Sequence, residues 1–157
     1  MSVSIEVEDP AWKSLSGLEE LVQATVKAVL SEAAGQDLDC DIAVLFTDDD
    51  TIAALNGEWR GKPKPTNVLS FPTSHDMPVP AGEPRPLGDV VLAHGVVMRE
   101  AAEQGKTLRD HTAHLIVHGT LHLIGYDHED DDEADKMEAL EIRVLKGLGI
   151  SDPYERD

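Results

Sequence analysis

Three histidines in the C-terminal half of the chain have the spacing of a metal site. His118, His122 and His128 form the pattern H-x-x-x-H-x-x-G-x-x-H, with Gly125 before the last histidine. Two imidazoles four residues apart lie on one face of a helix, where both can bind one ion. Gly125 can adopt a positive φ at little cost and end the helix, so the chain can turn back and bring His128 to the same ion.

The chemistry that this pattern favours is zinc binding with an open coordination position. Three neutral imidazoles suit Zn²⁺ and leave a fourth tetrahedral position for water or substrate, which is typical of a catalytic site. The alternative is a histidine-rich helix packed in a core. It is disfavoured because histidine clusters are seldom buried without a ligand. We therefore expect one Zn²⁺ held by His118, His122 and His128.

The residue after the first histidine distinguishes this chain from zinc peptidases. In metzincin proteases that residue is a glutamate that acts as general base. Here it is Gly119, so the spacing predicts a zincin-like site that lacks the peptidase's base. A metallopeptidase stays open as an alternative, and Gly119 is the feature against it.

Two long blocks of the sequence resemble the YbeY family of bacterial rRNA-maturation endoribonucleases. One block, Val117–His128, contains the histidine pattern, and the other, Trp59–Pro72, reads WRGKPKPTNVLSFP. Leu87–Val90 and Asp152–Tyr154 also look like the family. The resemblance therefore covers nearly the whole chain.

The resemblance implies a zincin-like architecture and a specific activity. The expected function is that of a zinc-dependent, single-strand-specific endoribonuclease in 16S rRNA 3′-end maturation and 70S ribosome quality control. Its expected partners are single-stranded RNA, rRNA, small-subunit ribosomal proteins and assembly factors. A non-catalytic, zinc-stabilised ribosome-assembly factor is a further alternative, and the open fourth zinc position argues against it.

Arg60 is the candidate for stabilising charge on a phosphate. A guanidinium presents a planar fork that matches phosphate and keeps its charge at working pH. From the residues alone, a solvated loop arginine is the simpler interpretation, but Arg60 matches the arginine of the family's block. Lys62 and Lys64 are candidates for attracting RNA phosphates or for solubilising the loop. His114, one turn before His118, is expected either to line a substrate cleft or to pack in the core.

In the expected mechanism, zinc lowers the pKa of a bound water or polarises a phosphoryl oxygen, and Arg60 stabilises the charge that develops. The sequence supplies no obvious general base. A zinc-bound hydroxide, a residue outside the motif, or an RNA 2′-hydroxyl acting as nucleophile can each fill that role.

Other polar residues near the motif have ordinary interpretations. Asp127 is a candidate hydrogen-bond partner for a ligand imidazole, and the acids at 129–133 suit the first turn of a helix. The helix that carries His118 and His122 is called the metal helix. His111 is expected at its solvent-exposed start, and Met137 is expected in the core. His75 and His94 have no partner spacing and are expected to be structural or on the surface.

The charge of the chain limits how it can bind nucleic acid. The formal net charge is −18, from 13 basic against 31 acidic residues. Residues 59–65 are an exception, because Arg60, Lys62 and Lys64 lie beside Trp59 with no acid among them. The composition excludes RNA binding over the whole surface and leaves binding by one face.

Length and cysteine content indicate one cytoplasmic domain spanning residues 1–157. A single cysteine, Cys40, excludes an internal disulfide and fits a reducing compartment. The first residues show neither a basic nor an apolar signal segment, and no apolar run is long enough to span a bilayer. We expect no membrane partner.

The hydropathy pattern predicts an α+β fold with a small four-stranded mixed sheet and about five helices. The second strand is apolar on both faces and is expected in the interior of the sheet, whereas flanking prolines place the third at an edge. Thr107 and Asp110 resemble a capping box that opens the metal helix, and the short second helix is expected to end at Asn56–Gly57. The predicted strands are 3–7, 40–46, 68–71 and 87–92, and the predicted helices are 18–33, 48–55, 94–104, 107–124 and 132–146.

Overall fold

Four strands form one mixed sheet in the computed structural model, which describes residues 2–34, 40–73, 80 and 82–154. The sheet order is β1-β2-β4-β3, with β1, β2 and β4 parallel and β3 antiparallel to β4. The predicted interior position of the second strand and edge position of the third are confirmed. The strands are β1 (Ser2–Val7), β2 (Cys40–Thr47), β3 (Val68–Pro72) and β4 (Arg85–Ala93).

Five α-helices accompany the sheet in the described residues, which confirms the predicted α+β fold. They are α1 (Leu18–Ala34), α2 (Asp49–Arg60), α3 (His94–Glu103), α4 (Leu108–Leu123) and α5 (Asp131–Gly147). A 3₁₀ helix, η1 (Pro10–Ser14), has no counterpart in the prediction. It is too short for a hydropathy period to reveal it, and it brings Trp12 into the core, where its indole donates to the Thr47 carbonyl at 3.0 Å.

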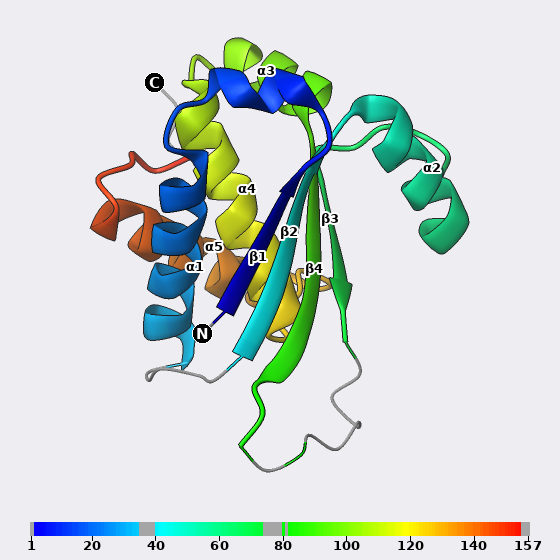
Figure 1. Cartoon of the computed structure of the whole chain (residues 1–157). Helices are drawn as coiled ribbons and strands as arrows, with labels where there is room; N and C mark the ends of the chain where they lie inside the picture. Colours follow the sequence, from blue (N-terminus) through cyan, green and yellow to red (C-terminus); the bar gives the residue numbers. More distant parts are fainter. Residues whose placement is uncertain (1, 35–39, 74–79, 81, 155–157) are drawn as a thin grey trace.

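The helices divide unequally between the two faces of the sheet. Figure 1 shows α1, α4 and α5 on one side and α2 alone on the other. Toward α1 and α4, alternate residues of β2, such as Ile42 and Phe46, are fully buried. Toward α2, the same strand leaves Ala43 and Leu45 only half-buried. The face covered by α2 is therefore the more open one.

Helix α4 lies between the sheet and α5. It contacts β3 and β4 on one side and α1, α3 and α5 on the others. A helix surrounded in this way is apolar over most of its circumference, and Ile116, Val117 and Leu121 are completely buried. Met137 of α5 packs in one apolar cluster with Val117 and Leu121, in the core as expected. The metal helix is thus the central element of the molecule.

The predicted end of the second helix is wrong. α2 continues through Asn56 and Gly57 to Arg60 and ends on Gly61, which has the positive φ of 69°. The Asn56 side chain is buried and donates to the Lys64 carbonyl at 3.0 Å, so it holds the following loop instead of ending the helix. Arg60 consequently lies in the last helical turn and not in the loop.

One sequence prediction lies outside the described residues. This is the case for the placement of His75. Within the described residues, no helix is long and apolar enough to cross a membrane.

Candidate metal centre and substrate surface

A side-chain cap at its start and a close contact with the sheet hold α4, the helix that carries His118 and His122. The Thr107 side chain caps it by accepting a hydrogen bond from the Asp110 backbone N–H at 3.1 Å, as the capping box predicts. Farther along, the Ser70 hydroxyl of β3 donates to the Gly119 carbonyl at 3.0 Å. A Cβ atom at position 119 would lie 2.8 Å from a methyl group of Val90. Gly119 therefore lets the helix approach the sheet closely.

The C-terminus of α4 turns the chain back toward the site. Gly125 has a φ of 105°, and its N–H donates to the His122 carbonyl at 3.1 Å. The Tyr126 N–H donates to the Leu121 carbonyl at 3.0 Å. These two bonds form a Schellman motif, which satisfies the last carbonyls of the helix and reverses the chain. The reversal places His128 beside the two helical histidines.

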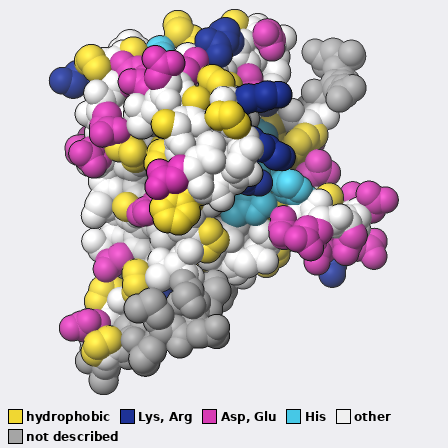
Figure 2. Space-filling model, turned by 90° about the vertical axis from the view of Figure 1, so that its right-hand side faces the viewer, with side chains coloured by type: hydrophobic (Ala, Val, Ile, Leu, Met, Phe, Trp, Pro, Cys, Tyr) yellow, Lys and Arg dark blue, Asp and Glu magenta, His cyan; other side chains and the backbone are white. Residues whose placement is uncertain are grey.

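The structure brings together all three histidines that the sequence indicated as ligands. One potential ligand atom from each of His118, His122 and His128 lies within 4.8 Å of the other two. His118 and His122 are half-buried and His128 is exposed, so the centre is open to solvent on one side. Figure 2 shows histidine side chains gathered on this face, with Lys and Arg side chains above them and a group of acidic side chains to their right.

The hydrogen bonds of the two helical histidines direct both Nε2 atoms toward a common point. Nδ1 of His118 lies 2.7 Å from a carboxylate oxygen of Glu141, and Nδ1 of His122 lies 2.9 Å from the Tyr126 carbonyl. Both partners can only accept, so each Nδ1 carries the proton and each Nε2 has a lone pair. The two Nε2 atoms are 3.0 Å apart.

Two facing lone pairs at this distance repel each other unless a cation or a proton lies between them. In a tetrahedral zinc site with Zn–N distances of about 2.05 Å, two nitrogens are about 3.3 Å apart. A small rearrangement of the rings therefore accommodates a metal ion. Burial, followed by the neighbouring His118, lowers the pKa of His122, which favours the neutral form that binds metal. The three residues fit a divalent metal of the zinc type.

Glu141 of α5 connects the metal centre to the polar residues behind it. It is completely buried, and it accepts hydrogen bonds from His118 and from the Tyr154 hydroxyl. His114 lies 3.6 Å from one Glu141 oxygen and 3.3 Å from the Tyr154 hydroxyl. Burial opposes ionisation of Glu141, but the hydrogen bonds from His114, His118 and Tyr154 outweigh it and lower its pKa to about 2. Glu141 is therefore ionised at neutral pH.

The spacing of residues along the chain does not predict that Glu141 pairs with His118. Glu141 follows His118 by 23 residues, and only the packing of α5 on α4 brings the two together. A glutamate inside the otherwise apolar stripe of α5 is the signal that was available. Among the described residues, the Asp127 carboxylate accepts from the His128 backbone N–H at 2.8 Å, and the imidazoles of His118 and His122 bond instead to Glu141 and the Tyr126 carbonyl.

The expectation that His111 lies at the exposed start of the helix is also wrong. His111 is 2% exposed, and its Nε2 lies 2.9 Å from a Glu100 carboxylate oxygen that also accepts from Asn67. Burial lowers the pKa of His111, although Glu100 opposes the shift. α3 and the start of β3 cover this part of α4, which the helix pattern by itself does not reveal. His94 has the structural place expected of it, packed edge-on against Trp12 with ring centroids 5.1 Å apart.

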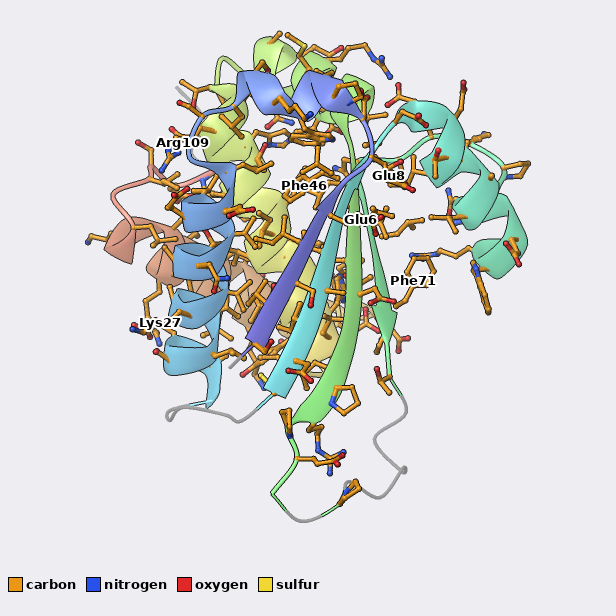
Figure 3. The ribbon with its side chains drawn as sticks, in the orientation of Figure 1. Glu6, Glu8, Lys27, Phe46, Phe71 and Arg109 are labelled. Carbon is orange, nitrogen blue, oxygen red and sulfur yellow. The ribbon has the colours of Figure 1, made fainter. Side chains whose placement is uncertain are left out.

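Arg60 lies in a groove on the other face of the sheet, between α2 and the strands. The groove has a volume of about 860 Å³, and Trp59, Arg60 and Phe71 are among its lining residues. Figure 3 shows Phe71 on the side of the sheet that faces α2. None of the three histidines lines this groove, but Ser70 does, and its hydroxyl reaches α4 at Gly119. The edge strand β3 therefore lies between Arg60 and the metal helix.

Lys62 and Lys64 are exposed in the loop that follows α2. The Lys62 N–H donates to the Asn56 carbonyl at 3.2 Å, and the Lys64 N–H donates to the Lys62 carbonyl at 2.7 Å. These backbone bonds hold the loop against the end of α2, which is also where Arg60 lies. His114 is separate from them, 12% exposed behind the metal centre.

Comparison with known proteins identifies close relatives along nearly the full chain. Endoribonuclease YbeY of Azorhizobium caulinodans is 48% identical over 156 residues, covering 98% of this chain and 96% of the relative. Endoribonuclease YbeY of Dinoroseobacter shibae is also 48% identical, with 98% and 91% covered. The solution structure of TM1509 from Thermotoga maritima matches with a TM-score of 0.58 and 26% identity over 98% of this chain and 99% of that one.

A family model described as Endoribonuclease YbeY matches residues 5–149. This range includes the three histidines, Arg60 and Glu141, and it leaves out only Tyr154 of the residues that surround the centre. With relatives at 48% identity over 98% of the chain, the protein belongs to the YbeY family.

Proposed function

We propose that the protein is a zinc-dependent endoribonuclease that cleaves single-stranded RNA in 16S rRNA 3′-end maturation and 70S ribosome quality control. Relatives at 48% identity bear the name Endoribonuclease YbeY, which supports an RNA endonuclease role. The observation that carries the metal assignment is the pair of facing Nε2 atoms of His118 and His122, 3.0 Å apart. Ribosomal small-subunit proteins and assembly factors are the proposed partners, and the cytoplasm is the proposed compartment for this single domain.

Each residue of the centre has a defined part in this proposal. His118, His122 and His128 hold the ion, and Glu141 and the Tyr126 carbonyl keep the helical imidazoles in the tautomer that binds it. When bound, zinc supplies a Lewis acid for phosphodiester hydrolysis.

The remaining residues act on the RNA. Arg60 is the proposed partner of the phosphate on which negative charge develops, because its planar fork and permanent charge suit that state. Lys62 and Lys64 attract the RNA backbone to the same end of α2. His114, whose Nε2 lies 3.3 Å from the Tyr154 hydroxyl and 3.6 Å from a Glu141 oxygen, is a further proposed substrate-binding residue.

A metallopeptidase is the alternative that the histidine spacing shares. The position of the peptidase's general base is held by Gly119, which is buried against β4. A side chain there has no space beside Val90, so this scaffold offers no place for the missing glutamate. The packing thus supports the nuclease over the peptidase.

RNA and peptide cleavage by the same zinc-loaded sample distinguish these functions. We expect cleavage of an unstructured RNA, loss of cleavage when a chelator removes the metal, and recovery when Zn²⁺ is restored, with no cleavage of casein. Zinc-dependent proteolysis would instead identify a peptidase. A sample that binds zinc and cleaves neither substrate would identify an assembly factor.

A further inference from the structure

Trp59 is a large aromatic side chain that the fold leaves in solvent. It is 66% exposed, whereas Trp12, the other tryptophan of the chain, is completely buried. Its position is the last turn of α2, next to Arg60. An indole exposes a large apolar surface, which makes it a strong candidate for a contact with a ligand.

The surroundings of Trp59 leave a flat surface of the indole open. Phe71 of β3 lies beside it, with ring centroids 6.3 Å apart and the ring planes inclined by 66°. Rings at this angle meet edge to face and do not stack, so at least one face of the indole stays uncovered. Apolar side chains such as Leu45, Leu55 and Val91 line the groove next to this pair.

Charge is distributed unevenly along the same groove. Arg60 lies at the Trp59 end, with Lys62 and Lys64 following it in the chain, and no acid occurs in residues 59–65. Glu6 and Asp89 line the groove from β1 and β4. A phosphate is therefore attracted to the end of α2 and repelled from the strands. The ligand that matches has a flat apolar ring with a negative charge on one side, which describes a nucleotide and not an apolar peptide.

We propose that Trp59 is a stacking platform for one unpaired base of the single-stranded RNA substrate, with the phosphate of that nucleotide beside Arg60. This inference rests on the proposed ribonuclease function and adds a binding subsite to it. Stacking on an exposed aromatic beside basic residues is a general means of binding single strands without reading their sequence. It also requires an unpaired base, so it favours single-stranded over double-stranded RNA.

The subsite is continuous with the metal centre around the edge strand. Ser70 of β3 lines the groove on one side, and its hydroxyl donates to the carbonyl of Gly119, the residue after His118. On the face that Figure 2 shows, Lys and Arg side chains lie directly beside the histidine side chains. An RNA strand held at Trp59 can therefore follow basic side chains around β3 to the metal centre.

Tryptophan fluorescence tests the subsite directly, because Trp12 is buried and only Trp59 is available for stacking. The titrant is a single-stranded 2′-O-methyl RNA oligonucleotide, which lacks the 2′-hydroxyl as a nucleophile, and the strand is checked for cleavage after the titration. We expect quenching of the emission in the wild type and none in Trp59→Phe. Trp59→Ala should raise the Kd about tenfold, whereas Trp59→Phe, which restores a ring, should stay within about threefold of the wild type. Met98→Ala, which removes another exposed apolar side chain, should bind like the wild type.

The same titration with an abasic oligonucleotide separates stacking from attraction to phosphate. We expect the abasic strand to give no quenching and to bind the wild type and Trp59→Ala equally weakly. Equal binding of the normal strand by wild type and Trp59→Ala would overturn it, as would quenching by an apolar peptide but not by RNA. Cleavage by Trp59→Ala with an unchanged KM would reject the subsite and leave the ribonuclease function standing. A wild type that binds with quenching but never cleaves RNA would reject the function alone.

Discussion

At the scale of single residues, Glu141 orients His118, one of the three proposed metal ligands. Its carboxylate is completely buried and receives the Nδ1 proton of His118 at 2.7 Å. A buried charge is stable only when several donors surround it, and here His114, His118 and Tyr154 supply them. Because the pKa of Glu141 falls from 4.5 to about 2, its ionised form stabilises the fold at neutral pH. This stabilisation is lost as the pH falls from about 4.5 toward 2.

Replacing Glu141 by glutamine should weaken zinc binding. The amide keeps the shape but removes the negative charge, and it turns an N–H₂ group toward one of the donors. We expect zinc affinity to fall by about 10- to 100-fold, measured by competition with a chelator at pH 7. Tyr154→Phe is the matched control, since it removes one donor and leaves the carboxylate on His118. If Glu141→Gln binds zinc as tightly as the wild type, Glu141 has no role in orienting the ligand.

Arg60 should affect RNA cleavage and not metal binding. Its side chain lies in the groove beside α2, which none of the three histidines lines. Arg60→Ala should fold and bind zinc normally and cleave single-stranded RNA roughly a hundredfold more slowly, the typical effect of removing one well-placed donor. Arg60→Lys should recover only part of the rate, since an ammonium does not reproduce the planar fork. Wild-type cleavage by Arg60→Ala, or a loss of zinc, would contradict this role.

The residue types and spacing predicted which histidines meet, because helical periodicity and one glycine determine their positions. The same reasoning failed for contacts between distant segments. His111 was expected in solvent and is buried by Glu100 and its neighbours, and Glu141 was not identified as a partner of His118. Such contacts depend on how α3 and α5 pack on α4, which no local pattern contains.

The position of α4 on the sheet is the main determinant of the site at the scale of elements. The helix can approach β3 and β4 closely only where it has no side chain, and Gly119 provides that place. The Ser70 hydroxyl then bonds directly to the helix backbone at 3.0 Å. Close packing here explains why a glycine follows the first metal-binding histidine.

Gly119→Ala should destabilise the protein because the added methyl group overlaps Val90. A Cβ atom would lie 2.8 Å from a Val90 methyl carbon, and overpacking of this kind costs about 1–3 kcal/mol. Gly147→Ala is the matched control, since Gly147 lies in α5 with nothing within 4 Å of a Cβ atom. There, the higher helix propensity of alanine should leave stability equal or higher. Urea denaturation of both variants measures the difference, and equal midpoints would refute the close contact.

Local signals predicted the elements themselves well, but not all of their boundaries. The four strands and five helices were found because their alternating and helical hydropathy patterns are long enough to distinguish. η1 has only five residues and was missed. α2 passes through Gly57 because Gly61 supplies the left-handed conformation one turn later. A sequence containing two suitable glycines does not show which of them ends the helix.

The whole molecule carries a net charge of −18, so RNA can be held by only a small basic surface. Arg60, Lys62 and Lys64 form that surface in the proposed substrate path. The slope of log affinity against log salt concentration reports how many phosphates the protein neutralises. Each neutralised phosphate of a single strand contributes about −0.7 to this slope. With three cations, we expect log affinity to fall with log salt concentration with a slope of about −2.

Titrations of single-stranded RNA at several salt concentrations measure this slope. Lys62→Ala and Lys64→Ala should each make it shallower by about 0.7. Lys27→Ala is a suitable control, because Lys27 lies on α1, across the sheet from α2, as Figure 3 shows. A slope of −5 or steeper would mean that a larger basic surface binds the RNA. A slope unchanged in both lysine variants would remove them from the binding site.

The central claim is that three histidines hold one catalytic zinc ion, and His128 tests it most directly because it comes from outside α4. Metal content and RNA cleavage are measured on the same samples of wild type, His128→Ala and the nearby exposed control Asp132→Asn. The wild type and Asp132→Asn should each contain about one zinc per chain and cleave RNA. His128→Ala should lose most of both while its circular dichroism spectrum is unchanged. A His128→Ala sample with a full complement of zinc, or one that cleaves RNA at the wild-type rate, would contradict the three-histidine site.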